Sequence, residues 1–546
     1  MRNIAVSPAR RERVAAFAAF AVTAFVFLAI LWPELGYVPI WDGRVYADCA
    51  IHAAATGLSM ESLRCAAHPS QGYIAVLAAS QLVWFGQIAA IHLTNAALGL
   101  LALASFRVVL GRVFPDPALA RHLDLVTFIC AVQPVLLSTL LQVNIDFGVY
   151  VFFFASLAAL LSGRFAWAAA AGVFLCFSKE TGVLAYAVMA GLDALLRALP
   201  GPRTISAFAR RLGGVLRPMW TLALPVLLFG AHVLWWNATH KQGAVWKQAW
   251  QKGTIDGFKF FDLSDPIFVS YAAGIFVVGF MWVVTGVIGS DLAWGGVRMA
   301  RRLPARAVPG ADHSRLVYLG ILTTVLTYLL TSYRTWSNLR YFALLYPLLV
   351  AMMFAAMLRL GIGRRARGAA LVAVAALFVF AAYRSSDPIS RLVYGTFSIG
   401  ERDMYRMSSI TQEYSGPGRD ELVYNLQFTG YHHVQDALFQ KLRPTDSTVF
   451  ATARLARWNV WSPLDARTYA RTLRGEHVIV PRYMDEVDVA TASPRPHDVW
   501  FLDFSYRPYK DRSLAGLARL YRDIGVVNAT ADGHTLVAHH LQLISP

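Results

Sequence analysis

The chain has 546 residues, of which 56% are hydrophobic and 15% are charged, and its mean hydropathy is +0.46. About a quarter of the residues of a soluble domain are charged, so this composition excludes an ordinary soluble protein and indicates several membrane spans. The net charge of +17 would suit a nucleic-acid partner, but the basic residues lie between apolar segments, and we expect no nucleic acid.

Apolar runs predict about eleven membrane-spanning helices within residues 1–384. In chain order they are Val14–Trp32, Ile88–Leu110, Leu125–Leu141, Phe147–Leu161, Phe165–Phe177, Gly182–Leu196, Met219–Trp236, Ile267–Ile288, Leu316–Thr331, Tyr341–Leu358 and Ala369–Tyr383. Two of them are short enough to be tilted or to cross half of the bilayer. The first run is too long for a cleaved secretory signal and should remain as an anchor.

Basic residues gather on one side of these predicted spans. Within residues 1–383, 22 lysines and arginines fall on the face that includes the N-terminus, and 9 fall on the other face. The positive-inside rule then places the N-terminus in the cytoplasm. Because the number of predicted spans is odd, everything after Tyr383 should lie outside the cytoplasm.

The composition changes after residue 384 to that of a soluble domain. The stretches ELVYNL, STVFATA, HVIVPR and VWFLDFS are typical of short strands, and YHHVQDALFQKL and SLAGLARLYRDIG have apolar residues at helical spacing. We therefore predict an α-helical polytopic membrane domain over residues 1–384 and an extracytoplasmic α/β domain over residues 385–546. The sequence has no glycine-rich phosphate loop and no internal repeat.

The chain has four cysteines, and none has the spacing of a zinc site. Cys130 and Cys176 lie in predicted spans, where packing is the expected role. Cys49 and Cys65 both lie in the first outer loop, where an oxidising compartment would allow a disulfide between them. Two free thiols are the alternative.

Ionisable residues recur at the outer ends of the predicted spans. Such groups are costly at membrane depth and usually have partners or a task, so these could meet over one cavity. Carboxylates suit proton removal from an acceptor, whereas arginine and lysine suit the binding of a phosphate that departs with negative charge. This combination favours transfer of a group from a lipid-linked phosphate. The set comprises Asp42, Asp48, His68, Asp146, Lys179, Glu180, Arg334 and Arg340, and Glu61 and Arg64 also lie in the first outer loop.

A structural role is the alternative for every member of this set. Aspartate is favoured as a helix N-cap. A neighbouring lysine and glutamate can neutralise each other, and an arginine at the end of a span can anchor the helix at the membrane interface.

Five stretches resemble, in their order along the chain, the polytopic GT-C glycosyltransferases. The resemblance is closest to the bacterial branch that includes protein O-mannosyltransferases and lipid A aminoarabinose transferases. The stretches are WDGRVYADCA, HPSQGY, NIDFGVYVFFFASLAALL, FLCFSKETG and NLRYFALLYPLL. The ordered match covers roughly residues 14 to 383, and the C-terminal domain has no matching motif. The resemblance implies a GT-C-like fold in the bacterial inner membrane, with the active site on the periplasmic face.

The resemblance also implies roles for single residues. Asp42 would be the catalytic base that deprotonates the acceptor, which attacks the anomeric carbon of the sugar with inversion. Arg340, followed by Tyr341, would bind the donor phosphate. The chain departs from the pattern at Gly43, where the relatives have Glu, and at Ser70, where they have a second proline. The remaining donor- or acceptor-binding residues would be Asp48, which could take over from the missing Glu, and His68, Asp146, Lys179, Glu180 and Arg334.

The implied donor is a polyprenyl-phosphate sugar, because nucleotide sugars are cytoplasmic, and the implied acceptor is a lipid, a glycan or a protein. Some relatives use a divalent metal; no metal ligand is assigned here, and the need for a metal stays open. Two other classes of function remain. A surface-polysaccharide polymerase or ligase would share the donor chemistry. A flippase or transporter of lipid-linked sugars would show inverted repeats and charges near the bilayer centre.

Overall fold

The computed structural model describes most of the chain. The described residues are 8–36, 39, 42–65, 68–199, 204–239, 272, 274–303, 307–332, 339–383, 387–394, 396–399, 402–405, 430–452, 476, 481–503, 510–531 and 534–544. Arg334 and the ELVYNL stretch, for which a role and a strand were predicted, fall outside these ranges.

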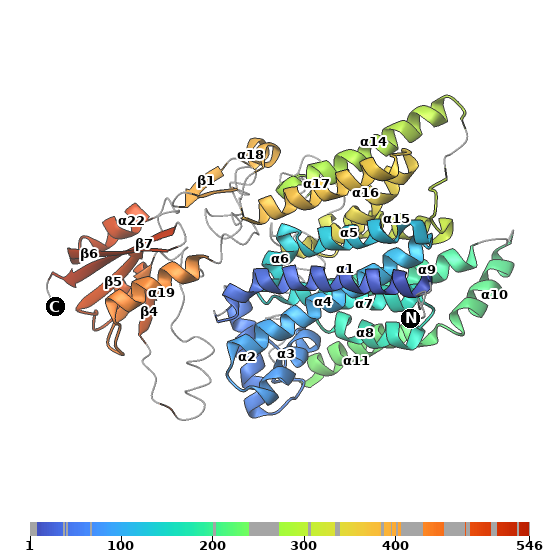
Figure 1. Ribbon diagram of the computed structural model, residues 1–546. Coiled ribbons are helices and arrows are strands. Elements are labelled where there is room, and N and C mark those ends of the chain that lie inside the picture. The colour runs from blue at the N-terminus through green and yellow to red at the C-terminus, as the bar shows by residue number, and fades with distance from the viewer. Residues whose placement is uncertain are drawn as a thin grey trace, which may run out of the picture.

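The described residues up to Tyr394 form a helical bundle (Figure 1). Its helices are α1 (Pro8–Leu31), α2 (Asp42–Thr56), α3 (Gln71–Val83), α4 (Ile88–Val113), α5 (Ala120–Ala131), α6 (Pro134–Leu141), α7 (Ile145–Leu161), α8 (Phe165–Cys176), α9 (Glu180–Ala198), α10 (Ile205–Leu216), α11 (Leu224–Thr239), α14 (Met281–Ala300), α15 (His313–Ser332), α16 (Leu345–Arg359), α17 (Arg364–Tyr383) and α18 (Pro388–Tyr394). Two short 3₁₀ turns matter below, η5 (Val278–Phe280) and η6 (Leu339–Phe342).

Helix α7 lies in the core of this bundle. Nearly all of its side chains are buried, as expected for a helix that is apolar on every side. It packs against α4, α8 and α9. The rings of Phe106 on α4 and Phe154 on α7 meet edge to face, 5.3 Å apart. This central helix begins at Ile145, beside one of the predicted site residues.

Every predicted span contains a helix, but the helices differ in length. Among the described residues, six helical segments are long and apolar enough to cross a membrane: Ile88–Val113, Glu180–Ala198, Trp220–Thr239, Val278–Ala300, His313–Ser332 and Arg364–Ala382. A seventh span results if the bent pair Pro117–Ala131 and Pro134–Leu141 is counted as one. The others, such as Phe165–Cys176, are shorter apolar helices. The protein is therefore a multi-helix membrane protein, and the number of about eleven spans stays a prediction.

Two predicted spans are interrupted. The span predicted over Leu125–Leu141 bends by 52° before Pro134, which cannot continue the preceding helix. The side chain of Gln133 caps the new helix by accepting from the amide of Leu136 at 2.8 Å. The span predicted over Ile267–Ile288 is placed too early, because Gly279 and Phe280 have positive φ and the helix α14 continues from Met281 to Ala300.

The segment predicted as the first outer loop is not irregular. It contains α2, and α3 begins at its end, although no helix was predicted there. Both are shorter than a membrane span, so a search for long apolar runs misses them. Figure 1 shows α2, α3 and the C-terminal sheet at one end of the bundle and α10 at the other end.

The C-terminal part contains a five-stranded mixed sheet with the strand order β4-β3-β5-β7-β6. Its strands are β3 (Val449–Thr452), β4 (Arg482–Asp485), β5 (Asp498–Asp503), β6 (Tyr521–Ala531) and β7 (His534–Leu543). β3 is parallel to β4 and β5, whereas β7 is antiparallel to β5 and β6. Helix α19 (Gly430–Leu442) packs against β6 and β7. A separate pair, β1 (Thr396–Ile399) and β2 (Arg402–Tyr405), forms a short antiparallel hairpin.

The sequence-based elements of this region agree in part. β3, β5 and α19 coincide with STVFATA, VWFLDFS and YHHVQDALFQKL, and β4 begins at the last residue of HVIVPR. The single helix predicted over SLAGLARLYRDIG is wrong in its second half, since α22 (Lys510–Leu517) ends early and Tyr521 opens β6. Tyr521 is buried and donates to the carbonyl of Pro496 at 2.9 Å, which holds the chain in the sheet.

Candidate active site

Four of the predicted site residues come from segments that are far apart in the sequence. Asp42 is the first residue of α2, and Asp146 is the second residue of α7. Lys179 directly precedes α9, and Arg340 lies in η6. Asp42 and Arg340 are separated by 298 positions, so only the fold brings them together. Asp42 and Asp146 lie in the first turns of their helices, where backbone amides favour negative charge.

These side chains form a chain of alternating charges. A terminal guanidinium nitrogen of Arg340 donates to the carboxylate of Asp42. The Nε atom of Arg340 lies 3.4 Å from Oδ2 of Asp146, and the other oxygen of Asp146 accepts from Nζ of Lys179 at 2.7 Å. Nζ of Lys179 also lies 3.9 Å from the centre of the Tyr341 ring, a cation–π contact. We call this group the ion-pair chain. Its side chains follow one another in the order Asp42, Arg340, Asp146 and Lys179, and the ring of Tyr341 lies at its end.

The members of this ion-pair chain differ in exposure. The side chains of Asp146, Lys179 and Arg340 are only 5%, 5% and 7% exposed, whereas that of Asp42 is 28% exposed. Burying charges is expensive unless they are paired, and each buried charge here has a partner of opposite sign. The accessible carboxylate of this group is that of Asp42, and the buried side chain of Arg340 holds it in place.

The close approach of α2 to the turn before α7 builds this geometry. A Cβ atom on Gly43 would lie 1.6 Å from the carbonyl oxygen of Gln142, so no larger residue fits without movement of the backbone. On the other side of that turn, the side chain of Asn144 accepts from the amide of Asp146 at 3.1 Å and caps α7. A glutamate at this position, as the resemblance in sequence would imply, would therefore collide with Gln142.

Tyr46 lies one turn after Asp42 and was not singled out from the sequence. Its side chain is buried, and burial raises the pKa of its hydroxyl well above the usual range, with the Asp42 carboxylate adding to the effect. The hydroxyl therefore stays protonated beside the ion-pair chain. The i, i+4 spacing from Asp42 on one helix was the signal that could have found it.

A second polar group lies beside the ion-pair chain and is centred on Glu180. Its carboxylate contacts Nδ1 of His68 at 3.0 and 3.1 Å. Nearby, the guanidinium of Arg64 stacks over the ring of Trp236, 3.9 Å from its centre. Burial lowers the pKa of Arg64 to about 10, and the charge of Glu180 partly offsets this. Since Glu180 follows Lys179 directly, the two groups share one corner of the fold.

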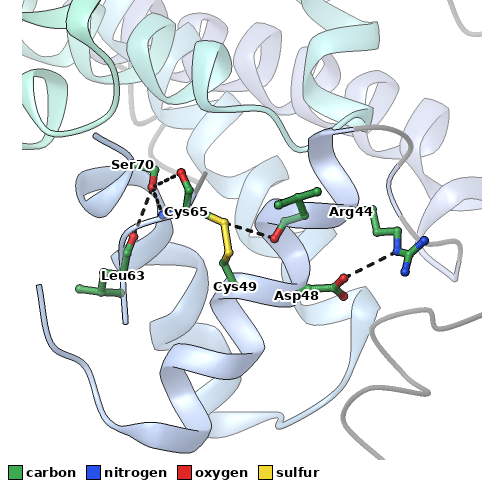
Figure 2. Close-up of a disulfide and its surroundings, with 7 residues drawn as sticks. Arg44, Asp48, Cys49, Leu63, Cys65 and Ser70 are labelled. Atoms are coloured by element: carbon green, nitrogen blue, oxygen red, sulfur yellow. Dashed lines mark hydrogen bonds and ion pairs between the residues drawn. A yellow bond between two sulfur atoms is a disulfide. The ribbon is translucent and has the colours of Figure 1, made fainter. Parts of the chain in front are cut away.

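Asp48, by contrast, pairs with Arg44 on the same helix at 3.6 Å (Figure 2). Arg44 in turn lies near Tyr483 on β4; burial raises the pKa of the Tyr483 hydroxyl, and the Arg44 charge partly offsets this rise. The structure thus places Asp48 toward the C-terminal sheet.

Cys49 and Cys65 are joined by a disulfide, with their Cα atoms 6.0 Å apart (Figure 2). The bond ties α2 to the segment that leads into α3. Ser70 accepts from the amide of Cys65 at 2.7 Å and orders that segment further. Closing a loop of this length stabilises a fold by about 3 kcal/mol in the chain-entropy account. The disulfide therefore helps to fix the helix that starts with Asp42.

Within the described ranges, no three His, Cys, Asp or Glu side chains come together in a way that could hold a metal ion. Each carboxylate of the ion-pair chain is already neutralised by a cation, Asp42 by Arg340 and Asp146 by Lys179. Among the described residues, the ion-pair chain would therefore offer a divalent metal, which takes several oxygen ligands, only these two cation-paired carboxylates.

Comparisons with known proteins show which solved structures have a similar fold. No family model matches the sequence, and no curated protein matches it. A solved structure of ArnT from Cupriavidus metallidurans bound to undecaprenyl phosphate matches with a TM-score of 0.51 at 15% identity, over 95% of this chain and 97% of that chain. The chain has the fold of ArnT. The apo state of the same ArnT matches with a TM-score of 0.50 at 14% identity, over 96% of this chain and 98% of that chain.

The ArnT-like fold confirms, at the level of the fold, the resemblance predicted from the five sequence stretches. It also extends that resemblance, because the match to ArnT covers nearly the whole chain, whereas the sequence motifs end near residue 383. An oligosaccharyltransferase from Archaeoglobus fulgidus matches more loosely, with a TM-score of 0.39 at 11% identity over 66% of this chain and 53% of that chain, and supports no argument.

Proposed function

We propose that this protein is a GT-C glycosyltransferase that moves a sugar from a polyprenyl-phosphate-linked donor to a lipid, glycan or protein acceptor, with Asp42 as general base. The observation that carries the proposal is the ion-pair chain: a partly exposed carboxylate is held by a buried arginine, beside a second buried pair of opposite charges. The ArnT-like fold supports it, because the matched ArnT structure contains undecaprenyl phosphate.

Donor binding follows from the charges of this site. The anionic phosphate of a donor would compete with Asp42 for the guanidinium of Arg340, since both are oxygen acceptors for the same N–H groups. The donor would thereby release the carboxylate next to the sugar. Asp42, Arg340, Asp146 and Lys179 carry no net charge together, so the donor phosphate needs further cations. Arg64 adjoins the site, and Arg334 is close to Arg340 in the sequence. His68, beside Glu180, could add a hydrogen bond.

The proposed reaction uses each residue for one step. The acceptor group loses its proton to Asp42 and attacks the anomeric carbon, with inversion. The bond between that carbon and the phosphate oxygen breaks, and the electron pair leaves with the polyprenyl phosphate. Arg340 stabilises the charge that develops on the departing phosphate, and Lys179 keeps Asp146 neutralised behind it. Tyr46 stays protonated and does not compete for the proton of the acceptor.

We infer further that the site and residues 385–546 face the periplasm of a bacterial inner membrane. The excess of basic residues on the opposite face supports this orientation. The disulfide between Cys49 and Cys65 supports it independently, because disulfides persist in oxidising compartments.

Reconstitution tests the reaction class. The purified full chain in liposomes receives a radiolabelled polyprenyl-phosphate monosaccharide together with an extract of envelope lipids, glycans and proteins. The proposal predicts labelled acceptor and free polyprenyl phosphate. Movement of the labelled lipid across the bilayer without bond transfer would instead establish a flippase, and the joining of whole glycans would establish a polymerase or ligase.

A further inference from the structure

A groove of about 1020 Å³ lies away from the candidate active site. Its described lining residues come from α14, from α15, from the ends of the connection between them (Arg302, Leu303, Ala307 and Val308) and from Met352 and Arg359 on α16. Arg359, at the C-terminal end of α16, lines it, whereas Arg340 precedes the first turn of that helix. The length of α16, about 22 Å for its 15 residues, separates the two sites along the bundle.

One end of this groove is basic. Among the described residues, Arg298, Arg302 and Arg359 line it together with one carboxylate, that of Asp291. Asp291 is buried and accepts from Arg359 at 2.9 Å, so that pair is neutral. Arginines therefore outnumber carboxylates among the described residues that line the groove. A cluster of this kind between membrane helices suits an anionic headgroup, because guanidinium groups match the geometry of phosphate oxygens.

The rest of the groove is mostly apolar, with His313 and Thr324 as polar members of its lining. Along α15, residues Leu316, Gly320 and Thr324 recur at i, i+4 and i+8 and line one face over about 12 Å. The hydroxyl of Thr324 donates to the carbonyl of Gly320 at 2.9 Å, so its hydrogen-bond requirement is met within the helix. Trp294 and Ile321 also line the groove and are exposed on the bundle, so the groove opens sideways toward lipid.

We propose that this groove binds one anionic phospholipid, with its phosphate at Arg298, Arg302 and Arg359 and an acyl chain along α15. The apolar wall distinguishes this ligand from a soluble anion, which would have no use for it. The excess positive charge distinguishes it from a zwitterionic lipid, whose headgroup carries no net charge. The volume is at the upper end of the range of about 300–1,000 Å³ typical of ligand pockets and accommodates part of an acyl chain as well as a headgroup.

Native mass spectrometry of the delipidated full chain tests this. Phosphatidylglycerol and phosphatidylcholine with identical acyl chains are titrated against the wild type, against the double variant R298Q/R302Q and against the double variant R210Q/R211Q. Arg210 and Arg211 are exposed on α10 and do not line the groove, so the second variant removes the same charge elsewhere.

The expected result is a phosphatidylglycerol affinity that falls about tenfold or more in R298Q/R302Q and is little changed in R210Q/R211Q, with phosphatidylcholine weak throughout. A Gly320→Phe variant tests the apolar wall. A Cβ at this position lies 3.6 Å from the terminal methyl of Met352, an ordinary contact, so the larger ring should enter the groove and displace the lipid. Thermal unfolding identifies any variant that fails to fold.

Three results would overturn the proposal. They are equal affinity of the wild type for the two lipids, an equal loss of phosphatidylglycerol in both double variants, and displacement of the lipid by millimolar inorganic phosphate. The first two would show that the binding is not selective or not located in the groove. The third would show a site for a free anion.

Discussion

Replacement of Gly43 by alanine tests how α2 is positioned. The added methyl group would lie 1.6 Å from the carbonyl oxygen of Gln142 and 2.9 Å from Cβ of Pro39, and non-bonded Cβ contacts below 3.0 Å essentially do not occur. The closest contact joins the new Cβ atom to a backbone oxygen, so no change of side-chain rotamer relieves it. The first turn of α2 must therefore move by about 1.4 Å from the turn before α7.

This movement has two measurable consequences. Overpacking of a well-packed contact costs about 1–3 kcal/mol in the free energy of unfolding, and the severity of this overlap favours the upper end. The helix propensity of alanine regains at most about 1 kcal/mol. Asp42 precedes Gly43, so the shift also separates its carboxylate from Arg340. A misplacement of about 1 Å at a catalytic group can cost about a hundredfold in rate.

Gly191→Ala is the matched control, because a Cβ on Gly191 in α9 has nothing within 4 Å. Thermal unfolding in detergent and the transfer assay are measured on both variants. We expect Gly43→Ala to lower both the melting temperature and the activity, and Gly191→Ala to leave activity intact with equal or higher stability. Wild-type melting temperature and activity for Gly43→Ala would refute the close approach of α2.

Three further perturbations address the site. Lys179→Met leaves the buried Asp146 without its 2.7 Å partner and should lower the free energy of unfolding by about 3–5 kcal/mol. The double variant with Asp146→Leu should regain part of this loss. An unchanged melting temperature of Lys179→Met would contradict the pairing. Arg340→Lys keeps the charge but cannot contact the carboxylates of Asp42 and Asp146 in the same way. We expect a folded variant whose transfer activity is reduced more than about tenfold. Full activity would argue against the role of the guanidinium group. Mass spectrometry of the non-reduced protein should show Cys49 linked to Cys65, and Cys49→Ser should cost about 3 kcal/mol; two free thiols in periplasmically exposed protein would exclude the bond.

Local properties of the sequence predict much of the bundle. An apolar run long enough to cross a membrane needs no distant information, and every predicted span contains a helix. The interruptions were harder to predict. Pro134 signals a bend, but the left-handed conformation of Phe280 has no signal of its own in the sequence. The helix predicted through Tyr521 failed because pairing of β6 with β7 outweighs the local helical spacing.

The candidate site, like the bundle, could be predicted from local features of the sequence only in part. Its residue types and their positions at the ends of predicted spans could be predicted from the charges there and from the family resemblance. The pairing of Asp42 with Arg340 and of Asp146 with Lys179 could not, because it depends on how distant segments pack. The reason for Gly43 likewise lies in a contact with Gln142 and not in any neighbour along the chain. Asp48 shows the reverse, since its pairing with Arg44 follows the i, i+4 rule of a helix that was not predicted.

The central claim concerns one carboxylate, and the most direct measurement compares Asp42→Asn with Asp48→Asn in the reconstituted transfer assay, with expression and melting temperature matched to the wild type. Both substitutions remove a negative charge from the same helix and differ by fewer than two turns in position. If Asp42 is the general base, its asparagine variant should lose nearly all transfer, while Asp48→Asn should retain most of it. Loss of transfer in Asp48→Asn alone would contradict the account.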